Sequence, residues 1–256
     1  MPMQISGSSA LVVGGTGGLG EATVRRLHAA GAKVVVADVN DEKGKALEQE
    51  LGVRYLRTDA GSEDDVRAAI AAAEAEGPFR VSVDTHGGPA GGGRLVGRDG
   101  EPMPLDAFRT TLESYLVSVF NVMRLTAAAM GRQEVSDDGD RGVIVNTASI
   151  AAYEGQIGQL PYSAAKGGVV GMTLVAARDL SPLAIRVVTI APGTFNTPAY
   201  GQHADRLEAH WGPQVPHPRR MGRSAEYAAL ACHIVENTYL NGEVIRLDGA
   251  LRFPPK

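Results

Sequence analysis

Seven short apolar runs alternate with longer amphipathic segments along this chain, and this alternation limits the possible folds more than any other feature. The runs are rich in β-branched and apolar residues, which is typical of strands buried on both faces of a sheet. Helix-length segments separate most of them, as expected where crossover helices join parallel strands. The sequence therefore predicts an α/β fold with a doubly wound parallel sheet of seven strands at residues 10–13, 34–37, 53–56, 81–83, 143–145, 185–190 and 243–247.

The segments between the strands predict helices for both faces of this sheet. Ser62 and Ser224 are of the residue type that favours the first position of a helix. A chain of 256 residues fits one domain with a single core, so residues 1–256 are expected to form a single domain. The expected helices are 18–30, 62–75, 105–130, 160–180 and 224–236.

Three segments have the composition of loops. Residues 86–104 are rich in glycine and proline, residues 132–141 carry four acids, and residues 192–222 hold five prolines with Trp211. In doubly wound sheets, ligands bind beyond the carboxyl ends of the strands, where the first and third loops begin. The third loop is therefore the expected substrate lid.

Composition excludes several other classes of protein. The net charge of −4, with no block of Lys or Arg, is unlike that of a nucleic-acid binder. The lone Cys232 has no disulfide partner, and the six histidines show no metal-binding spacing, so no metal is expected. Residues 1–9 lack the features of a signal peptide, and no apolar run reaches the roughly 20 residues of a membrane span. These features predict a cytoplasmic protein without a nucleic-acid or membrane partner.

A glycine-rich loop, GGTGGLG at residues 14–20, follows the first predicted strand directly and leads into an amphipathic helix. Residues without a Cβ let the backbone approach a pyrophosphate, whose charge the helix N-terminus favours. Two glycine registers fit, Gly15, Gly17 and Gly20 or Gly14, Gly18 and Gly20. A structural turn without a ligand is the alternative, but the strand before and the helix after favour a Rossmann-type dinucleotide site.

Asp38 ends the second predicted strand, twenty residues after Gly18. A carboxylate at this place accepts hydrogen bonds from the adenosine ribose and repels a 2′-phosphate. No Lys or Arg lies in the glycine loop, so NAD is favoured over NADP as the cofactor. Asp38 as a solvated turn residue is the alternative. Asp59 follows the third strand and is expected either to meet adenine or to cap a helix.

Tyr162 and Lys166 are four residues apart on a predicted helix and so share one face. A nearby ammonium favours the phenolate form of a tyrosine, which makes Tyr162 the expected proton acceptor. Ser149 lies thirteen residues before Tyr162, after a predicted strand, where its hydroxyl can bind a substrate oxygen. Taken singly these residues are ordinary core, surface and turn residues. In this order they predict interconversion of an alcohol and a ketone.

With these motifs the chain resembles the classical short-chain dehydrogenase/reductase family over essentially its whole length. Within that family it is most similar to the type-2 3-hydroxyacyl-CoA dehydrogenases, also called a 17β-hydroxysteroid dehydrogenase group. The segments that carry the resemblance are RGVIVNTASIAAYEGQIGQLPYSAAKGGVVGMTL, ARDLSPLAIRVVTIAPG and LNGEVIRLDGALR.

The resemblance implies an NAD-dependent homotetramer that acts on a small-molecule alcohol or ketone, with an acyl-CoA as one expected substrate. It selects the glycine register Gly14, Gly18 and Gly20. It also implies that Ser149 binds the substrate oxygen, Tyr162 is the acid/base and Lys166 holds the nicotinamide ribose. Further residues implied at the cofactor are Gly17, Leu19, Asp38, Asp59, Ala60, Thr85, Phe195 and Thr197, and those implied at the substrate are Gln156 and Gln159.

The sequence departs from the family pattern in three places. The usual Asn-Ala-Gly turn after the fourth strand reads Asp84-Thr85-His86-Gly87, and Val13 replaces the Thr that opens the glycine loop. Tyr115 replaces an Asn that, in the family, holds a water between the lysine and solvent. We therefore expect slower proton transfer between Lys166 and solvent. The alternatives are that the phenol hydroxyl of Tyr115, or His86, carries the proton in place of the water. The alternative function is an NAD(H)-binding scaffold or redox sensor without turnover.

Overall fold

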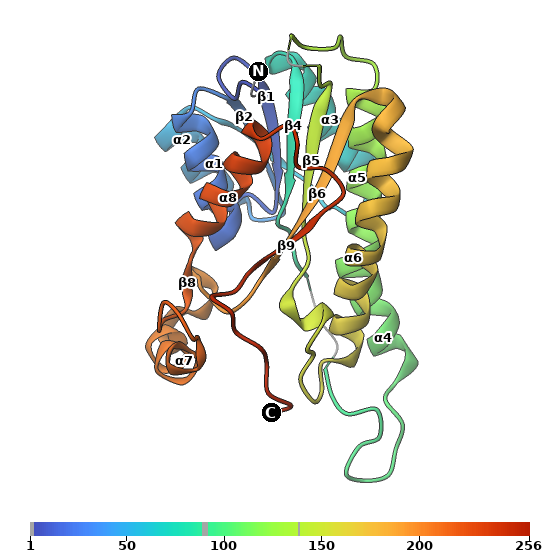
Figure 1. Ribbon diagram of the computed structural model, residues 1–256, viewed down its shortest axis with the longest axis vertical. Coiled ribbons are helices and arrows are strands. Elements are labelled where there is room, and N and C mark those ends of the chain that lie inside the picture. The colour runs from blue at the N-terminus through green and yellow to red at the C-terminus, as the bar shows by residue number, and fades with distance from the viewer. Residues whose placement is uncertain (1–2, 89–91, 138) are drawn as a thin grey trace.

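A computed structural model describes residues 3–88, 92–137 and 139–256, with the side chains of 199 and 200 also left undescribed. Residues 1–2 of the N-terminal segment, residues 89–91 of the expected loop 86–104 and residue 138 of the expected loop 132–141 lie outside the described residues. The chain forms a seven-stranded sheet of order β3-β2-β1-β4-β5-β6-β9 in which all paired strands are parallel (Figure 1). This confirms the predicted Rossmann-type α/β fold. The strands are β1 Ser9–Val13, β2 Lys33–Asp38, β3 Arg54–Arg57, β4 Phe79–Asp84, β5 Gly142–Thr147, β6 Ile185–Pro192 and β9 Val244–Leu247.

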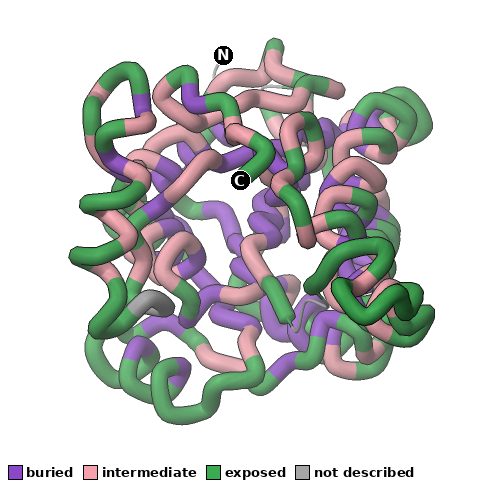
Figure 2. The backbone as a smooth tube through the Cα atoms, turned by 90° about the horizontal axis from the view of Figure 1, so that it is seen from below, coloured by how far each residue is buried: buried purple, intermediate pink, exposed green. Residues whose placement is uncertain are grey.

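Helices cover both faces of the sheet (Figure 1). Alternate residues of each strand point to opposite faces, so the sheet separates two apolar clusters. Val12 and Val145 belong to the cluster beneath α1 and α8, whereas Leu11 and Ile144 belong to the cluster beneath α3 and α5. Buried chain fills the middle of the molecule and exposed chain surrounds it (Figure 2). The helices are α1 Gly18–Ala29, α2 Asp41–Leu51, α3 Glu63–Glu76, α4 Leu105–Leu112, α5 Ser118–Met130, α6 Leu160–Leu180, α7 Ala204–Trp211 and α8 Ser224–Glu236.

Both predicted helix starts are confirmed. Ser62 caps α3, because its hydroxyl accepts a hydrogen bond from the backbone N–H of Asp65. The first residue of α8 is Ser224, although its cap is formed by Glu226, whose carboxylate accepts from the N–H of Arg223. Within the described residues, no helix has both the length and the apolar character needed to cross a membrane.

Two parts of the chain differ from the expectation. Helix α2 was not predicted, because only Gly44 and Leu47 are buried along it and a glycine inside a helix disfavours the helical state. The segment 192–222, expected as a loop, contains α7 and two short strands, β7 (Phe195–Asn196) and β8 (Gly222–Arg223), which pair with each other. Residues 192–222 are therefore not a continuous loop but include a helix and a short two-stranded sheet.

The predicted helix 105–130 is one continuous structure with an irregular middle. Helix α4 passes into a π-helical turn, η1 (Glu113–Val117), and then into α5. A π turn places one extra residue in the helix and changes the direction of the side chains around it. Tyr115 lies within this turn, and no periodic pattern in the sequence marks its position.

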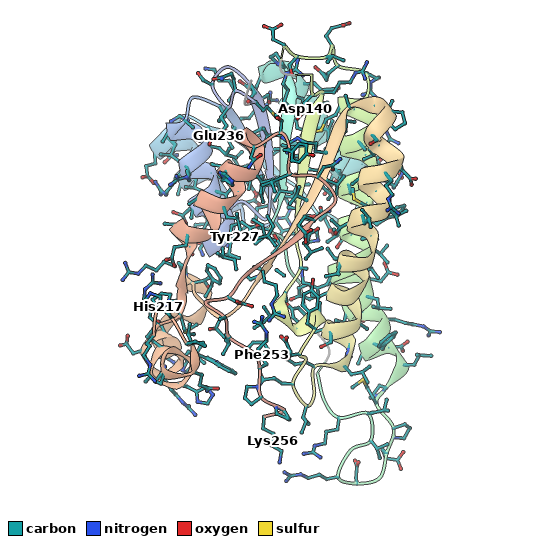
Figure 3. The ribbon with its side chains drawn as sticks, viewed as in Figure 1. Asp140, His217, Tyr227, Glu236, Phe253 and Lys256 are labelled. Carbon is teal, nitrogen blue, oxygen red and sulfur yellow. The ribbon has the colours of Figure 1, made fainter. Side chains whose placement is uncertain are left out.

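The carboxyl ends of the strands meet at one edge of the sheet, which is the lower edge in Figure 1. Asp38, Asp84 and Thr147 end β2, β4 and β5 at this edge. The C-terminal segment returns to the same end, where Figure 3 shows Phe253 and Lys256. There the N–H of Ile157 donates to the carbonyl of Pro255 at 3.0 Å. The fold thus gathers segments that are distant in sequence around one end.

Candidate active site

The glycine loop requires glycine at two positions because of close backbone contacts. A Cβ at Gly14 would lie 2.5 Å from the Cα of His86, and the φ angle of Gly14 is +74°. A Cβ at Gly20 would lie 2.0 Å from the carbonyl oxygen of Gly14. Any side chain at either position would therefore push the loop away from the end of β4.

A cleft of about 720 Å³ opens beside this loop. It extends from the end of β2 to the π turn and the start of α5, across the carboxyl ends of the central strands. The predicted cofactor residues that line it are Gly14, Gly17, Asp38, Asp59, Ala60 and Thr85. A long cleft at this edge, with a glycine loop and a helix N-terminus in its wall, has the features of a dinucleotide site.

Asp38 is held rigidly at one end of the cleft. Its two carboxylate oxygens accept hydrogen bonds from the backbone N–H groups of Thr16 and Asn40, each at 3.0 Å. Lys43, in the first turn of α2, lines the same end, and the sequence analysis did not identify it because α2 was not predicted. Asp59 also lines the cleft, and its carboxylate accepts from the N–H of Gly61, whereas Ser62 caps the helix.

The other predicted cofactor residues lie behind or beside the cleft. A Cβ at Gly18 would lie 2.8 Å from the Cβ of Thr197, so the loop after β6 packs directly on the start of α1. Leu19 and Phe195 pack into the apolar cluster beneath α1 and α8. These three contacts fix how the glycine loop, α1 and the segment after β6 fit together.

Gln156 and Gln159 lie on the loop between η2 (Ile150–Ala152) and α6. The carboxamide oxygen of Gln159 accepts from the N–H of Gln156 at 3.1 Å. Gln156 lines a second hollow of about 550 Å³, which the described residues of the loop after β4, Arg94 among them, also line. The Gln156 side chain donates to the carbonyl of Pro254 in the C-terminal segment.

Lys166 and Tyr162 project from the first two turns of α6. The ammonium Nζ of Lys166 donates to the carbonyl of Thr147 at the end of β5, at 2.7 Å, and lies 5.8 Å from the centroid of the Tyr162 ring. Burial lowers the pKa of Lys166 to about 8, against the opposing charge of Asp84. Ser149 lies two residues after the end of β5 and precedes η2, which packs on α6. Its hydroxyl accepts from the N–H of Ala151 at 3.1 Å.

Tyr115 enters the same group from the π turn. Its ring meets the ring of Tyr162 edge-on, with centroids 5.1 Å apart, and also lies 5.1 Å from Nζ of Lys166. Its hydroxyl donates to the carbonyl of Gly88 at 2.6 Å. The phenol therefore occupies the side of Lys166 and Tyr162 that faces the loop after β4.

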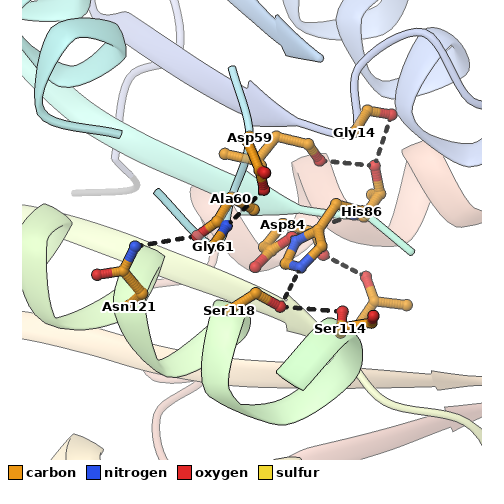
Figure 4. Close-up of polar contacts among 12 residues, drawn as sticks. Gly14, Asp59, Ala60, Gly61, Asp84, His86, Ser114, Ser118 and Asn121 are labelled. Atoms are coloured by element: carbon orange, nitrogen blue, oxygen red, sulfur yellow. Dashed lines mark hydrogen bonds and ion pairs between the residues drawn. The ribbon is translucent and has the colours of Figure 1, made fainter. Parts of the chain in front are cut away.

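A chain of three polar side chains lies beside this group, and the sequence had singled out only one of them. Nδ1 of His86 contacts the buried carboxylate of Asp84, and Nε2 of His86 lies 2.6 Å from the hydroxyl of Ser118 (Figure 4). The Ser118 hydroxyl donates in turn to the carbonyl of Ser114 at 2.9 Å. The Asp84-x-His86 spacing after a strand was visible in the sequence, but the pairing with Ser118 depends on the π turn.

Comparison with known proteins supports a single family. Residues 8–207 match the family model described as short chain dehydrogenase. The chain is 45% identical over 254 residues to 3-hydroxyacyl-CoA dehydrogenase type-2 from Homo sapiens, covering 98% of this chain and 97% of that protein. It is equally identical to the protein of the same name from Drosophila melanogaster, with coverage of 98% and 100%.

A solved structure agrees with this assignment. The crystal structure of 3-hydroxyacyl-CoA dehydrogenase type-2 from Mycobacterium avium superposes with a TM-score of 0.95, with 52% identity and 98% of both chains covered. Its likeness extends across the sheet, the glycine loop and the helix that bears Tyr162 and Lys166. The chain therefore belongs to the short-chain dehydrogenase family and is an oxidoreductase that acts on secondary alcohols.

Proposed function

We propose that this protein is an NAD-dependent dehydrogenase that interconverts a 3-hydroxyacyl-CoA, or a similar secondary alcohol, with its ketone. The observation that carries the proposal is the buried ammonium of Lys166 beside the Tyr162 ring, on a fold whose glycine loop and Asp38 line a long cleft. The relatives reported above are named as dehydrogenases, which favours turnover over the alternative of a binding-only scaffold.

Proton transfer at Tyr162 is the step that the protein itself performs. The positive charge of Lys166 favours the phenolate of Tyr162, which takes the hydroxyl proton of the alcohol. Ser149 is proposed to hydrogen-bond the same substrate oxygen while its charge changes. A bound nicotinamide supplies the hydride acceptor. In the reverse direction Tyr162 donates the proton to the ketone oxygen.

NAD is the proposed cofactor because of Asp38. Its carboxylate is fixed by two backbone N–H groups and would repel a 2′-phosphate, whereas it accepts hydrogen bonds from ribose hydroxyls. Lys43 at the same end is exposed and has a flexible side chain. We therefore expect NADH to bind at least about tenfold more tightly than NADPH, and Asp38→Ala to narrow the difference. Equal dissociation constants for the wild type would exclude this proposal.

An acyl-CoA substrate is proposed from the names of the relatives and from the hollow beside Gln156. Leu95, Val96 and Ile157 expose apolar side chains there, and Arg94 adds a cation. Such a surface suits an acyl chain that ends in a phosphorylated group. We further propose a homotetramer and a reducing, cytoplasmic location, the latter because the single cysteine, Cys232, can form no internal disulfide.

A substrate screen tests the function directly. Acyl-CoA, steroid and small hydroxy-acid alcohols are offered with NAD, and NADH formation is followed by its absorbance. We expect 3-hydroxyacyl-CoA thioesters to give the highest kcat/KM. Tight NADH binding without turnover of any alcohol, or of any ketone in reverse, would contradict the proposal and favour the scaffold.

A further inference from the structure

The C-terminal segment, residues 251–256, runs between α7 and the loop that follows β5 (Figure 1). Phe253 lies on it, at the end of the molecule where the strands of the sheet end (Figure 3). Its contacts are with parts of the chain that are distant in sequence. On one side is α7, and on the other is the substrate loop, residues 149–159, which carries the predicted substrate residues Ser149 and Gln156.

An apolar cluster holds the beginning of the substrate loop. Ile150, Leu251 and Val215 are buried together, and none of them is more than 3% exposed. They come from the substrate loop, the C-terminal segment and the chain just after α7. Ile150 follows Ser149 directly, and the Ser149 hydroxyl accepts from the N–H of Ala151 within the same turn. A shift of Ile150 would therefore move the Ser149 hydroxyl.

Main-chain carbonyls of the C-terminal segment hold the other end of the substrate loop. The carbonyl of Pro255 accepts from the N–H of Ile157 at 3.0 Å. The carbonyl of Pro254 accepts from the carboxamide nitrogen of Gln156 at 3.3 Å. Both bonds use main-chain oxygens, so they depend on where the segment lies and not on the side chains of its prolines.

Phe253 joins the C-terminal segment to α7. Its ring lies 5.1 Å from the ring of Trp211, centroid to centroid, with an angle of 54° between the planes. Both rings also pack against the cluster that holds Ile150. Trp211 is the last residue of α7, within the segment 192–222 that the sequence predicts as the substrate lid. A displacement of α7 would therefore reach the substrate loop through Phe253, because close-packed side chains cannot shift singly.

The cofactor cleft is separate from these contacts. Among the residues that the structure describes, its wall contains none from the C-terminal segment and none from the substrate loop. A change in the C-terminal segment should therefore affect the alcohol and leave the nucleotide unaffected.

We propose that the C-terminal segment braces the substrate loop against α7 and so fixes the places of Ser149 and Gln156 during the reaction. The inference rests on the proposed function, which gives the loop its substrate. Leu251 and Phe253 are positioning residues in this scheme, because they act through the loop. Displacing Ser149 weakens its hydrogen bond to the substrate oxygen and lowers kcat, whereas displacing Gln156 raises KM.

The kinetic test uses Phe253→Ala, which removes the ring contact with Trp211 and leaves the main chain in place. For alcohol oxidation, kcat should fall about tenfold and KM should rise about fivefold, with NADH affinity unchanged. Phe253→Leu keeps an apolar side chain against Trp211 and should retain at least about half of the wild-type kcat. Tyr239→Ala is the control, because it removes a ring that is 99% exposed at the opposite end of the sheet.

Two kinetic results would overturn the proposal. One is wild-type kcat and KM in Phe253→Ala. The other is a loss of NADH affinity in proportion to the loss of kcat, which would show a general structural role. A chain that stops after Arg252 also lacks the carbonyls that hold Gln156 and Ile157, so it should be impaired at least as much as Phe253→Ala.

The second test needs no turnover and measures hydrogen exchange of the Ile157 amide in the protein without cofactor or substrate. This N–H donates to Pro255, so its exchange reports the hold of the C-terminal segment on the loop. Trp211→Leu, on α7, and Phe253→Ala should each speed the exchange about fivefold or more, and the double variant should be no faster than the faster single one. Tyr239→Ala should leave it unchanged.

The two tests separate this inference from the proposed function. Wild-type exchange at Ile157 in Trp211→Leu would show that α7 and the substrate loop are not joined, and would overturn the brace while leaving the proposed function intact. A wild type that oxidises no alcohol would contradict the proposed function. The exchange measurement would then decide alone, because faster exchange in Trp211→Leu supports the brace and unchanged exchange overturns it.

Discussion

Lys166 is a buried ammonium that donates to the carbonyl of Thr147 and lies over the rings of Tyr115 and Tyr162. The sequence predicted that it shares a helix face with Tyr162, because a spacing of four follows from helix geometry alone. Its burial was not predictable, since the residues that contact it, Thr147 and Tyr115, come from β5 and the π turn. At the residue scale, the identities of the reacting groups could be inferred from the sequence and their electrostatic setting could not.

The lowered pKa of Lys166 predicts a pH dependence of stability. The folded protein releases the Lys166 proton at about pH 8 and the unfolded chain at 10.5, so the unfolded state binds more protons between these values and stability rises with pH. Relative to Lys166→Met, the wild type should gain about 3 kcal/mol in free energy of unfolding between pH 7 and pH 10.5. Denaturant titrations of both proteins at the two pH values measure this difference, and a constant difference would contradict it.

Tyr115 gives a second prediction at this scale. Its ring, more than its hydroxyl, fills the space beside Lys166, because the hydroxyl is committed to the carbonyl of Gly88. Tyr115→Asn should therefore raise kcat without a change in NAD affinity, and Tyr115→Phe should change kcat by less than about twofold. A Tyr115→Phe variant that loses nearly all activity would make the hydroxyl itself the proton path.

At the scale of elements, the strongly periodic segments were predictable and the locally adapted ones were not. All seven strands of the sheet lie within a few residues of their predicted positions, because strands buried on both faces read as continuous apolar runs. Helix α2 was missed because Gly44 packs against the ring of Tyr55, where a larger residue would not fit. The π turn was missed because it depends on tertiary contacts rather than on a residue pattern.

The C-terminal strand and the loop before α6 are tied together by an ion pair. Arg246 at the end of β9 binds both carboxylate oxygens of Glu154, at 2.7 and 2.8 Å, and also binds Asp248. Arg246→Met should loosen the loop that carries Gln156 and raise KM for the substrate about fivefold, with NADH affinity unchanged. Arg67→Met, which removes an exposed charge paired with Glu63 on α3, is the control. Equal KM values in wild type and Arg246→Met would show that the pair has no part in substrate binding.

At the scale of the whole molecule, the fold class and the end of the sheet that binds ligands followed from strand order and the glycine loop. The full set of residues in the cleft wall could not be predicted, because Lys43 and Ser118 reach it from elements whose geometry the sequence did not show.

The outer surface of the molecule has one further feature. Val117, Phe120, Leu174 and Val175 expose apolar side chains along α5, the π turn and α6, at 45%, 49%, 47% and 57%.

These exposed side chains favour a subunit interface in the proposed tetramer. Val175→Asp should place a charge in that interface and shift the protein to a smaller species in sedimentation velocity. Val135→Asp, on the exposed part of the loop before β5, should leave the assembly unchanged. A monomeric wild type would contradict the proposed assembly.

The central claim is that Tyr162 transfers the proton in a reaction whose cofactor is held by other residues. The most direct measurement is kcat and NADH affinity of Tyr162→Phe, which keeps the ring beside Tyr115 and Lys166 but lacks the hydroxyl. The expected result is loss of turnover by about 10²-fold or more with nearly unchanged NADH binding. A Tyr162→Phe variant that keeps a tenth or more of the wild-type rate would contradict the mechanism.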